Sequence, residues 1–296
     1  MKKIMGVDIG GTKIAIGLLN EENKLDYQLE LASDTTDANT MYRVVQNGIK
    51  ACLIDNHLME KDVVLGIGVP GIIDVENGIA IYQNNLPWKN FPIISQLKKD
   101  FPKITQITME NDVTCAAIAE WKALKLAATD SMVFLTVSTG IASPVIIGGV
   151  PVKGMGTSGE IGLLPVKCPF KQQVERLEWA ASGTAISEFA KISYGIEMDG
   201  EEIFKCYHGR DEKAVEIIES VVVSLSHAIY SISCLIDPTK IVLGGSVIMK
   251  NPFLISLIKA QLAKEIIPVQ QHILSALTLS KYDNNASLVG ACLISQ

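Results

Sequence analysis

The amino-acid sequence predicts an α/β protein made of two similar domains that face each other across a cleft. Stretches with the composition of buried strands alternate along the chain with stretches in which apolar residues recur at helical spacing. A strand–glycine turn–strand unit begins at Ile4 and another at Met132, so each half of the chain opens in the same way. Small-molecule sites usually form in clefts between domains.

The first half of the chain opens with two apolar strands, expected at 4–9 and 13–19, around the turn Gly10-Gly11-Thr12. Gly-Gly pairs are common in tight hairpin turns. The remaining elements expected in this half are helices at 41–53, 92–101 and 113–126, and strands at 63–69 and 104–110.

The second half begins with the same strand–turn–strand arrangement, with strands expected at 133–137 and 144–150 around a turn at 138–141. Asp237-Pro238 ends a long apolar helix, because proline cannot continue one. The other elements expected here are helices at 184–194, 214–236 and 286–294, and strands at 240–247 and 277–281.

Composition excludes several classes of protein. The 296 residues are 48% hydrophobic and 20% charged, which excludes intrinsic disorder and permits a large core. The net charge is 26 − 32 = −6 without a Lys/Arg block, so we expect neither nucleic acid nor a membrane as partner. No apolar run approaches the ~18–20 residues of a membrane span. Six scattered cysteines favour reduced thiols and a cytoplasmic protein.

The string Asp8-Ile9-Gly10-Gly11-Thr12-Lys13 is the first candidate for ligand binding. Glycines let the backbone approach a ligand and turn its N–H groups toward phosphate oxygens. Thr12 adds a hydroxyl, Lys13 a positive charge, and Asp8 a carboxylate able to hold Mg²⁺ through water. An ordinary hairpin turn explains the same glycines, and the string by itself does not decide between the two readings.

Residues 66–71 match the pattern G-x-G-x-x-G, but we do not interpret them as a dinucleotide fingerprint. That fingerprint needs a helix at its third glycine, and Pro70 with the β-branched residues 72–73 blocks one. These glycines are expected to let a strand end bend, with Gly71 touching a ligand.

Glu110-Asn111-Asp112 closes an expected strand and opens an expected helix. Asp112 taken alone is more simply explained as a helix N-cap. Glu160 and Glu178 are likewise unremarkable in isolation. Their significance comes from occurring together with the other motifs, in one order.

Taken together, the motifs resemble the ROK family of bacterial sugar kinases and repressors, along the whole chain. The matching segments are Asp8–Lys13, Val69–Gly71, Asn85-Leu86, Glu110–Asp112, Ser158–Gly162, Glu178–Gly183 and Asp237–Gly245. The resemblance implies the actin-like ATPase (ribonuclease H-like) fold. It also implies a smaller domain at 1–112, completed by a C-terminal helix at about 284–296, and a larger domain at 113–283.

The resemblance further implies ATP-dependent phosphorylation of a hexose at O6, with ATP and Mg²⁺ as cofactors and Asp112 as general base. Residues implied to hydrogen-bond the sugar are Gly71, Asn85, Asn111, Glu160 and Glu178. Residues implied to bind ATP and Mg²⁺ are Asp8, Gly10, Gly11, Thr12, Lys13, Thr139, Gly140, Gly244 and Gly245. Phosphoryl transfer depends mostly on positioning and charge neutralisation, which suits this set.

Three departures from the family pattern stand out. Ala142-Ser143-Pro144 replaces glycines in the second phosphate turn, so we expect weaker phosphate contacts. Leu163 stands where the family has a zinc-binding histidine. Cys168 lies almost alone in a segment that is cysteine-rich in the family, with Arg176 in place of its last cysteine. We therefore predict no structural zinc.

The resemblance leaves the sugar open among glucose, N-acetylmannosamine and β-glucosides, and leaves room for a homodimer. A sugar-sensing pseudokinase with a weakened ATP site is the alternative that the altered turn suggests. A transcriptional repressor is disfavoured, since the first strand begins at Ile4 and no helix-turn-helix precedes it.

Overall fold

The computed structural model describes residues 2–83 and 85–296, which form two compact units. The first unit runs to Leu124 and includes Asn285–Gln296, and the second is Lys125–Asn284. Each has its own sheet and hydrophobic core. The sequence places the division after Asp112, whereas in the structure it follows Leu124. The reason is that the helix beginning at Asp112 packs against the C-terminal helix within the first unit.

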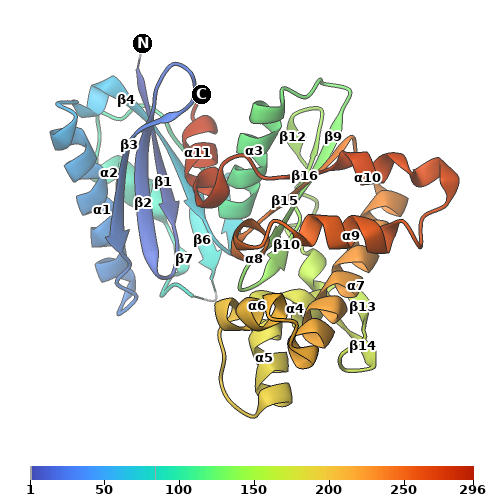
Figure 1. Cartoon of the computed structure of the whole chain (residues 1–296). Helices are drawn as coiled ribbons and strands as arrows, with labels where there is room; N and C mark the ends of the chain where they lie inside the picture. The colour runs from blue at the N-terminus through green and yellow to red at the C-terminus, as the bar shows by residue number, and fades with distance from the viewer. Residues whose placement is uncertain (1, 84) are drawn as a thin grey trace. The chain divides into compact units, whose positions relative to one another are not determined.

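Figure 1 shows the elements of the first unit in blue to green, with its C-terminal helix in red. The strands of its main sheet are β1 (Lys3–Ile9), β2 (Lys13–Leu19), β3 (Leu25–Ala32), β4 (Val63–Val69) and β8 (Ile107–Asn111). A smaller sheet contains β5 (Ile72–Asp74), β6 (Ile79–Tyr82) and β7 (Lys89–Phe91). The helices are α1 (Ala38–Asp55), α2 (Ile93–Asp100), α3 (Asp112–Leu124) and α11 (Ala286–Leu293), with 3₁₀ turns η1 (Glu60–Asp62) and η4 (Asp283–Asn285).

The main sheet of the first unit has the order β3-β2-β1-β4-β8. β1 is antiparallel to β2 and parallel to β4, and β4 is parallel to β8. Successive residues of a strand point to opposite faces. Ile16 of β2 meets α1 at Gly48, while the next residue, Gly17, meets α11 at Leu288. Helices α1 and α11 therefore cover opposite faces, with α3 packed on α11.

A row of glycines lets α11 lie unusually close to this sheet. Gly17, Gly6 and Gly66 are neighbours in register across β2, β1 and β4. A Cβ on Gly66 would lie 1.8 Å from the Ala291 carbonyl oxygen of α11, so no side chain fits there. On the other side of α11, a Cβ on Gly290 would lie 1.8 Å from the Cys115 carbonyl oxygen of α3. Sheet, α11 and α3 thus pack through backbone contacts.

The second unit has more helices around a similar sheet. Its strands are β9 (Ser131–Val137), β10 (Ile141–Ala142), β11 (Val145–Ile147), β12 (Val150–Pro151), β15 (Lys240–Gly244) and β16 (Leu277–Leu279), with a separate hairpin of β13 (Pro165–Cys168) and β14 (Gln173–Arg176). Its helices are α4 (Leu177–Ala181), α5 (Gly183–Tyr194), α6 (Gly200–His208), α7 (Glu212–Leu235), α8 (Ser246–Lys250), α9 (Leu254–Leu262) and α10 (His272–Ala276), with 3₁₀ turns η2 (Ile161–Leu163) and η3 (Pro268–Gln270).

The sheet of the second unit has the order β12-β11-β9-β15-β16, with β10 paired to β9. β9 is antiparallel to β11 and parallel to β15, and β15 is parallel to β16. In both units an antiparallel hairpin therefore continues into parallel strands, which confirms two similar α/β sheets. The expected strand at 144–150 is interrupted, because Gly148 and Gly149 form a turn with φ of 60° and 84° between β11 and β12.

Helix α7 lies in the core of the second unit. It is long and apolar enough to cross a membrane by length and composition alone, with a mean hydropathy of 1.5. However, 67% of the 18-residue stretch of α7 to which this value applies is buried inside the protein. There α7 packs against α4, α5, α6 and α9. Uninterrupted apolar runs in the sequence do not reveal α7, because serines such as Ser220 and Ser224 divide its apolar residues. Burial identifies α7 as a core helix.

Candidate active site

The turn between β1 and β2 contains the first predicted phosphate-binding residues. Gly10 N–H donates to the Lys13 carbonyl oxygen at 2.9 Å. Ser33 donates twice, through its N–H to Thr12 O at 3.0 Å and through Oγ to Gly10 O at 2.6 Å. A Cβ on Gly11 would lie 2.9 Å from Cβ of Asn85, so this predicted sugar-binding residue packs directly on the turn. The turn is thus held by the protein itself.

Lys13, predicted to bind ATP and Mg²⁺, forms an ion pair with a neighbouring strand. Its ammonium group pairs with Glu30 Oε1 on β3 at 2.7 Å, and both side chains are 46% exposed. The charge assigned to a phosphate is therefore neutralised by a neighbouring strand. Exposed pairs of this kind are worth about 1 kcal/mol or less, so the pairing is easily exchanged for another anion.

Asp8 and Asp112 lie close together at the carboxyl edge of the first sheet. Asp8 is near the end of β1, and Asp112 begins α3 directly after β8. Gly68 of β4 adjoins both: a Cβ there would be 3.5 Å from Asp8 Oδ1 and 3.5 Å from Asp112 Cα. Burial, and next the charge of Asp112, raise the pKa of Asp8 to about 7, while Lys13 acts in the opposite direction. Two adjacent carboxylates of this kind form a site suited to a cation.

Asn111, and not Asp112, caps helix α3. Its Oδ1 accepts hydrogen bonds from the N–H groups of Val113 at 3.0 Å and Thr114 at 3.1 Å. Its Nδ2 donates to the Gly71 carbonyl oxygen at 3.2 Å. Asp112 is therefore not the N-cap of α3. Asn111 caps the helix, and Asp112 follows it as the first helical residue.

Gly71 has to be glycine, and it lies next to Gln83, a residue that the sequence did not indicate. Its φ is 76°, and a Cβ would lie 2.4 Å from the Tyr82 carbonyl oxygen. Next to it, the side chain of Gln83 is 4% exposed and donates through Nε2 to Ile72 O at 3.3 Å. Gln83 thereby braces the segment that holds Asn111. No sequence pattern distinguishes it from a surface loop glutamine.

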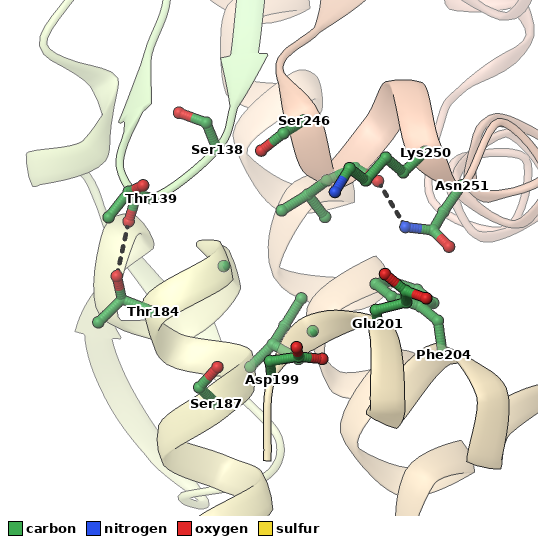
Figure 2. A pocket seen from close by; sticks show the side chains of 14 residues that line it. Ser138, Thr139, Thr184, Ser187, Asp199, Glu201, Phe204, Ser246, Lys250 and Asn251 are labelled. Carbon is green, nitrogen blue, oxygen red and sulfur yellow. Dashed lines mark hydrogen bonds between the residues drawn. The ribbon is translucent and has the colours of Figure 1, made fainter. Parts of the chain in front are cut away.

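The second predicted phosphate turn, Ser138–Ile141, is held by the segment from α4 to the start of α5. Gly183 N–H donates to the Ser138 carbonyl oxygen at 2.7 Å. Thr184 Oγ1 donates to the Thr139 carbonyl oxygen at 3.0 Å, as Figure 2 shows. Within the turn, Ser138 N–H donates to Gly140 O at 2.9 Å. Thr184 was not predicted, although it directly follows a motif that was.

Glu178 connects this turn with the predicted sugar-binding carboxylates. Its Oε2 accepts a hydrogen bond from Ile141 N–H at 3.1 Å. A Cβ on Gly140 would lie 2.6 Å from the same oxygen, so a side chain there would displace the Glu178 carboxylate. Partial burial, followed by the charge of Glu178, raises the pKa of Glu160 above its usual value. The second unit thus brings both predicted carboxylates and the phosphate turn together.

Residues Ala142, Ser143 and Pro144 do not form part of the phosphate turn. Ala142 lies in β10, and Ser143 is 4% exposed with its N–H donated to Gly159 O at 2.6 Å. Pro144 O accepts from Phe134 N–H at 3.1 Å. These residues extend a hairpin and make hydrogen bonds within the protein, and the expectation of weaker phosphate contacts stays a prediction.

A cavity of about 800 Å³ opens beside the second turn, entirely within the second unit (Figure 2). Its lining residues are Ser138, Thr139, Gly183, Thr184, Ile186, Ser187, Asp199, Gly200, Glu201, Phe204, Ser246, Val247, Lys250 and Asn251. Gly244 and Gly245 precede the lining helix α8 and pack on β9. A Cβ on Gly245, whose φ is 84°, would lie 2.3 Å from Val137 O. These two glycines therefore position the pocket wall.

Most of the lining from α5 and α6 was missed by sequence reasoning. Asp199 caps α6, with its Oδ1 accepting from Glu202 N–H at 2.9 Å while its own N–H donates to Glu202 Oε2 at 2.9 Å. An Asp-x-x-Glu pattern indicates a helix start but carries no information about a ligand.

The segment that is cysteine-rich in the family forms the β13–β14 hairpin here. Cys168 is buried, with its Sγ 3.9 Å from Ser220 Oγ, and Leu163 is 54% exposed. Within residues 2–83 and 85–296, no group of three or more His, Cys, Asp and Glu side chains is arranged to hold a metal ion. The absence of structural zinc stays a prediction.

The structure gathers the predicted residues into two sets. The first unit contains Asp8, Gly10, Gly11, Thr12, Lys13, Gly71, Asn85, Asn111 and Asp112. The second unit contains Thr139, Gly140, Glu160, Glu178, Gly244 and Gly245. The residues of both sets lie at strand ends, turns and short helices, and turns and helix starts offer backbone N–H groups to a ligand.

Comparison with known proteins accounts for this combination of motifs. Residues 4–296 match the model of the ROK family. N-acetylmannosamine kinase of Shigella boydii is 31% identical over 301 residues, covering 99% of this chain and 98% of the relative. Glucokinase of Thermotoga maritima is 28% identical over 286 residues, covering 90% and 89%.

Among solved structures, the ROK family glucokinase of Streptomyces griseus, in complex with glucose and AMPPNP, superposes with a TM-score of 0.80. The identity is 21%, and the match covers 99% of each chain, so the likeness concerns the fold. Together with the two sheet topologies, it confirms the predicted actin-like ATPase fold. Since the family match spans nearly the whole chain, this protein belongs to the ROK family.

Proposed function

We propose that this protein transfers the γ-phosphoryl group of ATP to O6 of a hexose or hexose derivative, with Asp112 as the general base. The observation that supports this most is the start of α3, where Asn111 provides the cap and Asp112 follows beside Asp8. The curated relatives that match most of the chain, a glucokinase and an N-acetylmannosamine kinase, point to the same reaction class.

The base needs an ionised carboxylate held in one place. Asp112 has this position because Asn111 fixes the first turn of the helix through two backbone N–H groups and is itself anchored on Gly71 O. Proton removal from the sugar hydroxyl by such a group contributes typically about 10²–10⁴ in rate. The fixed helix start keeps the carboxylate oriented toward the hydroxyl.

The residues around Asp8 fit a magnesium ion. Mg²⁺ prefers oxygen ligands and keeps several waters, so it is commonly bound through one or two carboxylates and substrate phosphates. Asp8, with its pKa raised to about 7 by burial and by Asp112, gains most from a nearby cation. Bound there, Mg²⁺ would supply neutralisation of phosphate charge. Asp8 would hold the ion, and the Gly10–Thr12 turn would offer hydrogen-bond donors to the phosphate oxygens.

The nucleotide is assigned to the cavity of the second unit. Its volume of about 800 Å³ lies in the usual range for cofactor sites, and the Ser138–Ile141 turn borders it. In this proposal Thr139 and Gly140 contact the phosphates. Gly244 and Gly245 lie behind the wall of the cavity that faces the adenosine. The intact anchoring of this turn does not favour the pseudokinase alternative.

The sugar hydroxyls are assigned to Gly71, Asn85 and Asn111 in one set and to Glu160 and Glu178 in the other. Because Asn111 Oδ1 is occupied by backbone N–H groups, its contribution is the remaining N–H of its amide. Glu178 Oε2 is likewise engaged by Ile141 N–H, which leaves Oε1 for the sugar.

A panel assay tests the proposal. Purified protein is incubated with Mg²⁺–ATP and glucose, N-acetylmannosamine, N-acetylglucosamine or a β-glucoside, and ADP formation is followed. We expect one or two of these sugars to be phosphorylated, with ³¹P and ¹³C NMR locating the phosphate on O6. ADP release that no sugar stimulates, or a product phosphorylated elsewhere, would contradict the proposal.

A further inference from the structure

The cavity of the second unit is bordered, on the side away from the phosphate turn, by an asparagine with a fixed side chain. Figure 2 shows Thr139 and Thr184 on one side of this cavity and Lys250 and Asn251 on the other. Asn251 directly follows α8 and is 9% exposed. Its Nδ2 donates to Val247 O at 2.9 Å. A polar side chain held in the wall of a ligand cavity is suited to orienting the ligand.

Two hydrogen bonds to the end of α8 define the orientation of Asn251. Its backbone N–H donates to Ile248 O at 3.0 Å and closes the last turn of the helix. Its side chain satisfies Val247 O, one of the carbonyl groups that a helix end leaves without a helical partner. Because a carbonyl oxygen only accepts, the amide nitrogen has to face Val247. The amide retains one N–H donor and the acceptor Oδ1.

The charged groups of the lining are less suited to reading the edge of a ligand. Asp199 Oδ1 already accepts a backbone N–H at 2.9 Å, and Glu201 pairs with Lys205 at 2.9 Å. Lys250 is exposed and carries donors only. Among the lining residues of the described chain, Asn251 alone has a planar amide. It therefore presents one donor and one acceptor side by side in a fixed plane.

The surroundings of this amide suit a flat aromatic base. Val247 of α8 and Phe204 of α6 give the cavity apolar lining. Phe204 is 5% exposed, and its ring meets the edge of the Phe253 ring with 6.1 Å between centroids. Apolar walls favour the faces of a base, while its polar edge needs hydrogen-bonding partners. With the phosphates at Thr139, as proposed above, the base lies toward Asn251.

We propose that Asn251 recognises the adenine base and makes the protein prefer ATP over GTP as phosphoryl donor. The inference rests on the proposed function, because it takes this cavity as the nucleotide site. Adenine presents the acceptor N7 beside the N6 amino donor, and a side-chain amide pairs with both. The remaining N–H of Asn251 donates to N7, and Oδ1 accepts from the N6 amino group. Guanine presents the acceptors N7 and O6, so Oδ1 would face another acceptor.

The test measures the dissociation constants of Mg²⁺–AMPPNP and Mg²⁺–GMPPNP by calorimetry, without sugar. We expect the wild type to bind AMPPNP about tenfold or more tightly than GMPPNP, as one bidentate pair allows. The side chain in Asn251→Leu branches at the same atom without polar groups, so its two constants should agree within about twofold. In 7-deaza-ATP a C–H replaces N7, and the wild type should bind it several-fold more weakly than ATP.

Asn56→Leu is the matched control. Asn56 directly follows α1, and its Nδ2 donates to Cys52 O at 2.8 Å, so it closes a helix end as Asn251 does. It belongs to the first unit and does not line the cavity, so this variant should keep the wild-type ratio. The comparison of ATP with 7-deaza-ATP uses the wild type alone and does not depend on the folding of a variant.

Three results would overturn the role of Asn251 and leave the kinase proposal standing. They are equal binding of AMPPNP and GMPPNP by the wild type, a preference for AMPPNP that persists in folded Asn251→Leu, and undiminished binding of 7-deaza-ATP. Failure of the wild type to bind any of these nucleotides would instead overturn the nucleotide site and the kinase proposal with it.

Discussion

Adjacent residues at the start of α3 carry different tasks, and the hydrogen bonds show how they are divided. Asn111 gives both ends of its amide to backbone groups, while Asp112 stands at the first helical position beside Asp8. A carboxylate at the first turn of a helix is favoured by the helix dipole, whose positive end lies at the N-terminus of α3. Burial at the end of β1 instead raises the pKa of Asp8.

Asp8 yields a prediction about pH. Its pKa is about 7 in the folded protein, well above the value of 3.8 expected when unfolded. The folded state therefore binds more protons over this range, and the stability that Asp8 contributes is complete below pH 3.8 and lost as pH rises through 7. Asp8→Asn removes this loss. In the absence of Mg²⁺, the variant should melt at a higher temperature than wild type at pH 8 and at a similar temperature near pH 4.

Asp74→Asn is the control for that experiment. Hydrogen bonds from Asn77 lower the pKa of Asp74, so its contribution is present at neutral pH and lost on acidification. The control should be slightly less stable than wild type at pH 8, the opposite sign. An Asp8→Asn variant that melts below wild type at pH 8 without metal would mean that burial and the charge of Asp112 do not destabilise the ionised Asp8.

At the residue scale, motifs in the sequence suggested candidate site residues but not the contacts that these residues make. Motif order singled out Asp112, Glu160 and Glu178 as candidates, but only the coordinates show that Asn111 is the cap and that Lys13 pairs with Glu30. Gln83 and Thr184 were not found, because their roles depend on which carbonyl oxygen lies nearby. A side chain that acts through a backbone partner has no signature of its own.

At the scale of elements, the long periodic segments were predictable and the short ones were not. Helices α1, α5 and α7 and strand β4 follow their patterns closely, since burial on one face or on both determines those patterns. Strand β3 alternates between exposed and partly buried residues at the sheet edge, and it was missed because its apolar signal is weak. The strands of the β5-β6-β7 sheet are too short for any period to emerge.

Packing between elements gives a second prediction, at Gly290 of α11. A Cβ there would lie 1.8 Å from the Cys115 carbonyl oxygen, and backbone cannot give way as a side-chain end would. We expect Gly290→Ala to lower the free energy of unfolding by about 1–3 kcal/mol, measured by urea denaturation, despite the better helix propensity of alanine.

Gly200→Ala is the matched control, because this glycine also lies in a helix but meets nothing within 4 Å. Its midpoint should stay at or slightly above that of wild type. Equal midpoints for Gly290→Ala and wild type would show that α3 and α11 pack less closely than described.

At the scale of the whole molecule, the repeated strand–turn–strand unit predicted the duplicated architecture, and the two sheet orders bear this out. The turn chemistry within each repeat was less predictable. Ala142-Ser143-Pro144 looked like a damaged phosphate turn, yet Ser143 N–H is donated to Gly159 O and the segment is a strand end. The comparison with the family pattern assumed that residues at matching positions have the same structural environment.

The boundary of the first unit also depends on long-range packing. The sequence marks Asp112 as the end of a motif, but α3 belongs to the first unit because α11 returns to pack on it. The two glycines at which α11 contacts β4 and α3, Gly66 and Gly290, are separated in sequence by most of the chain. No local pattern connects them.

The assignment of Asp112 as general base is tested most directly by Asp112→Asn. The amide keeps the size and hydrogen-bonding shape of the carboxylate but cannot take the proton from the sugar hydroxyl. We predict that turnover falls by about 10²–10⁴, while the dissociation constants of the sugar and of Mg²⁺–AMPPNP change only a few-fold. Turnover within a few-fold of wild type, at unchanged binding, would contradict the proposed mechanism.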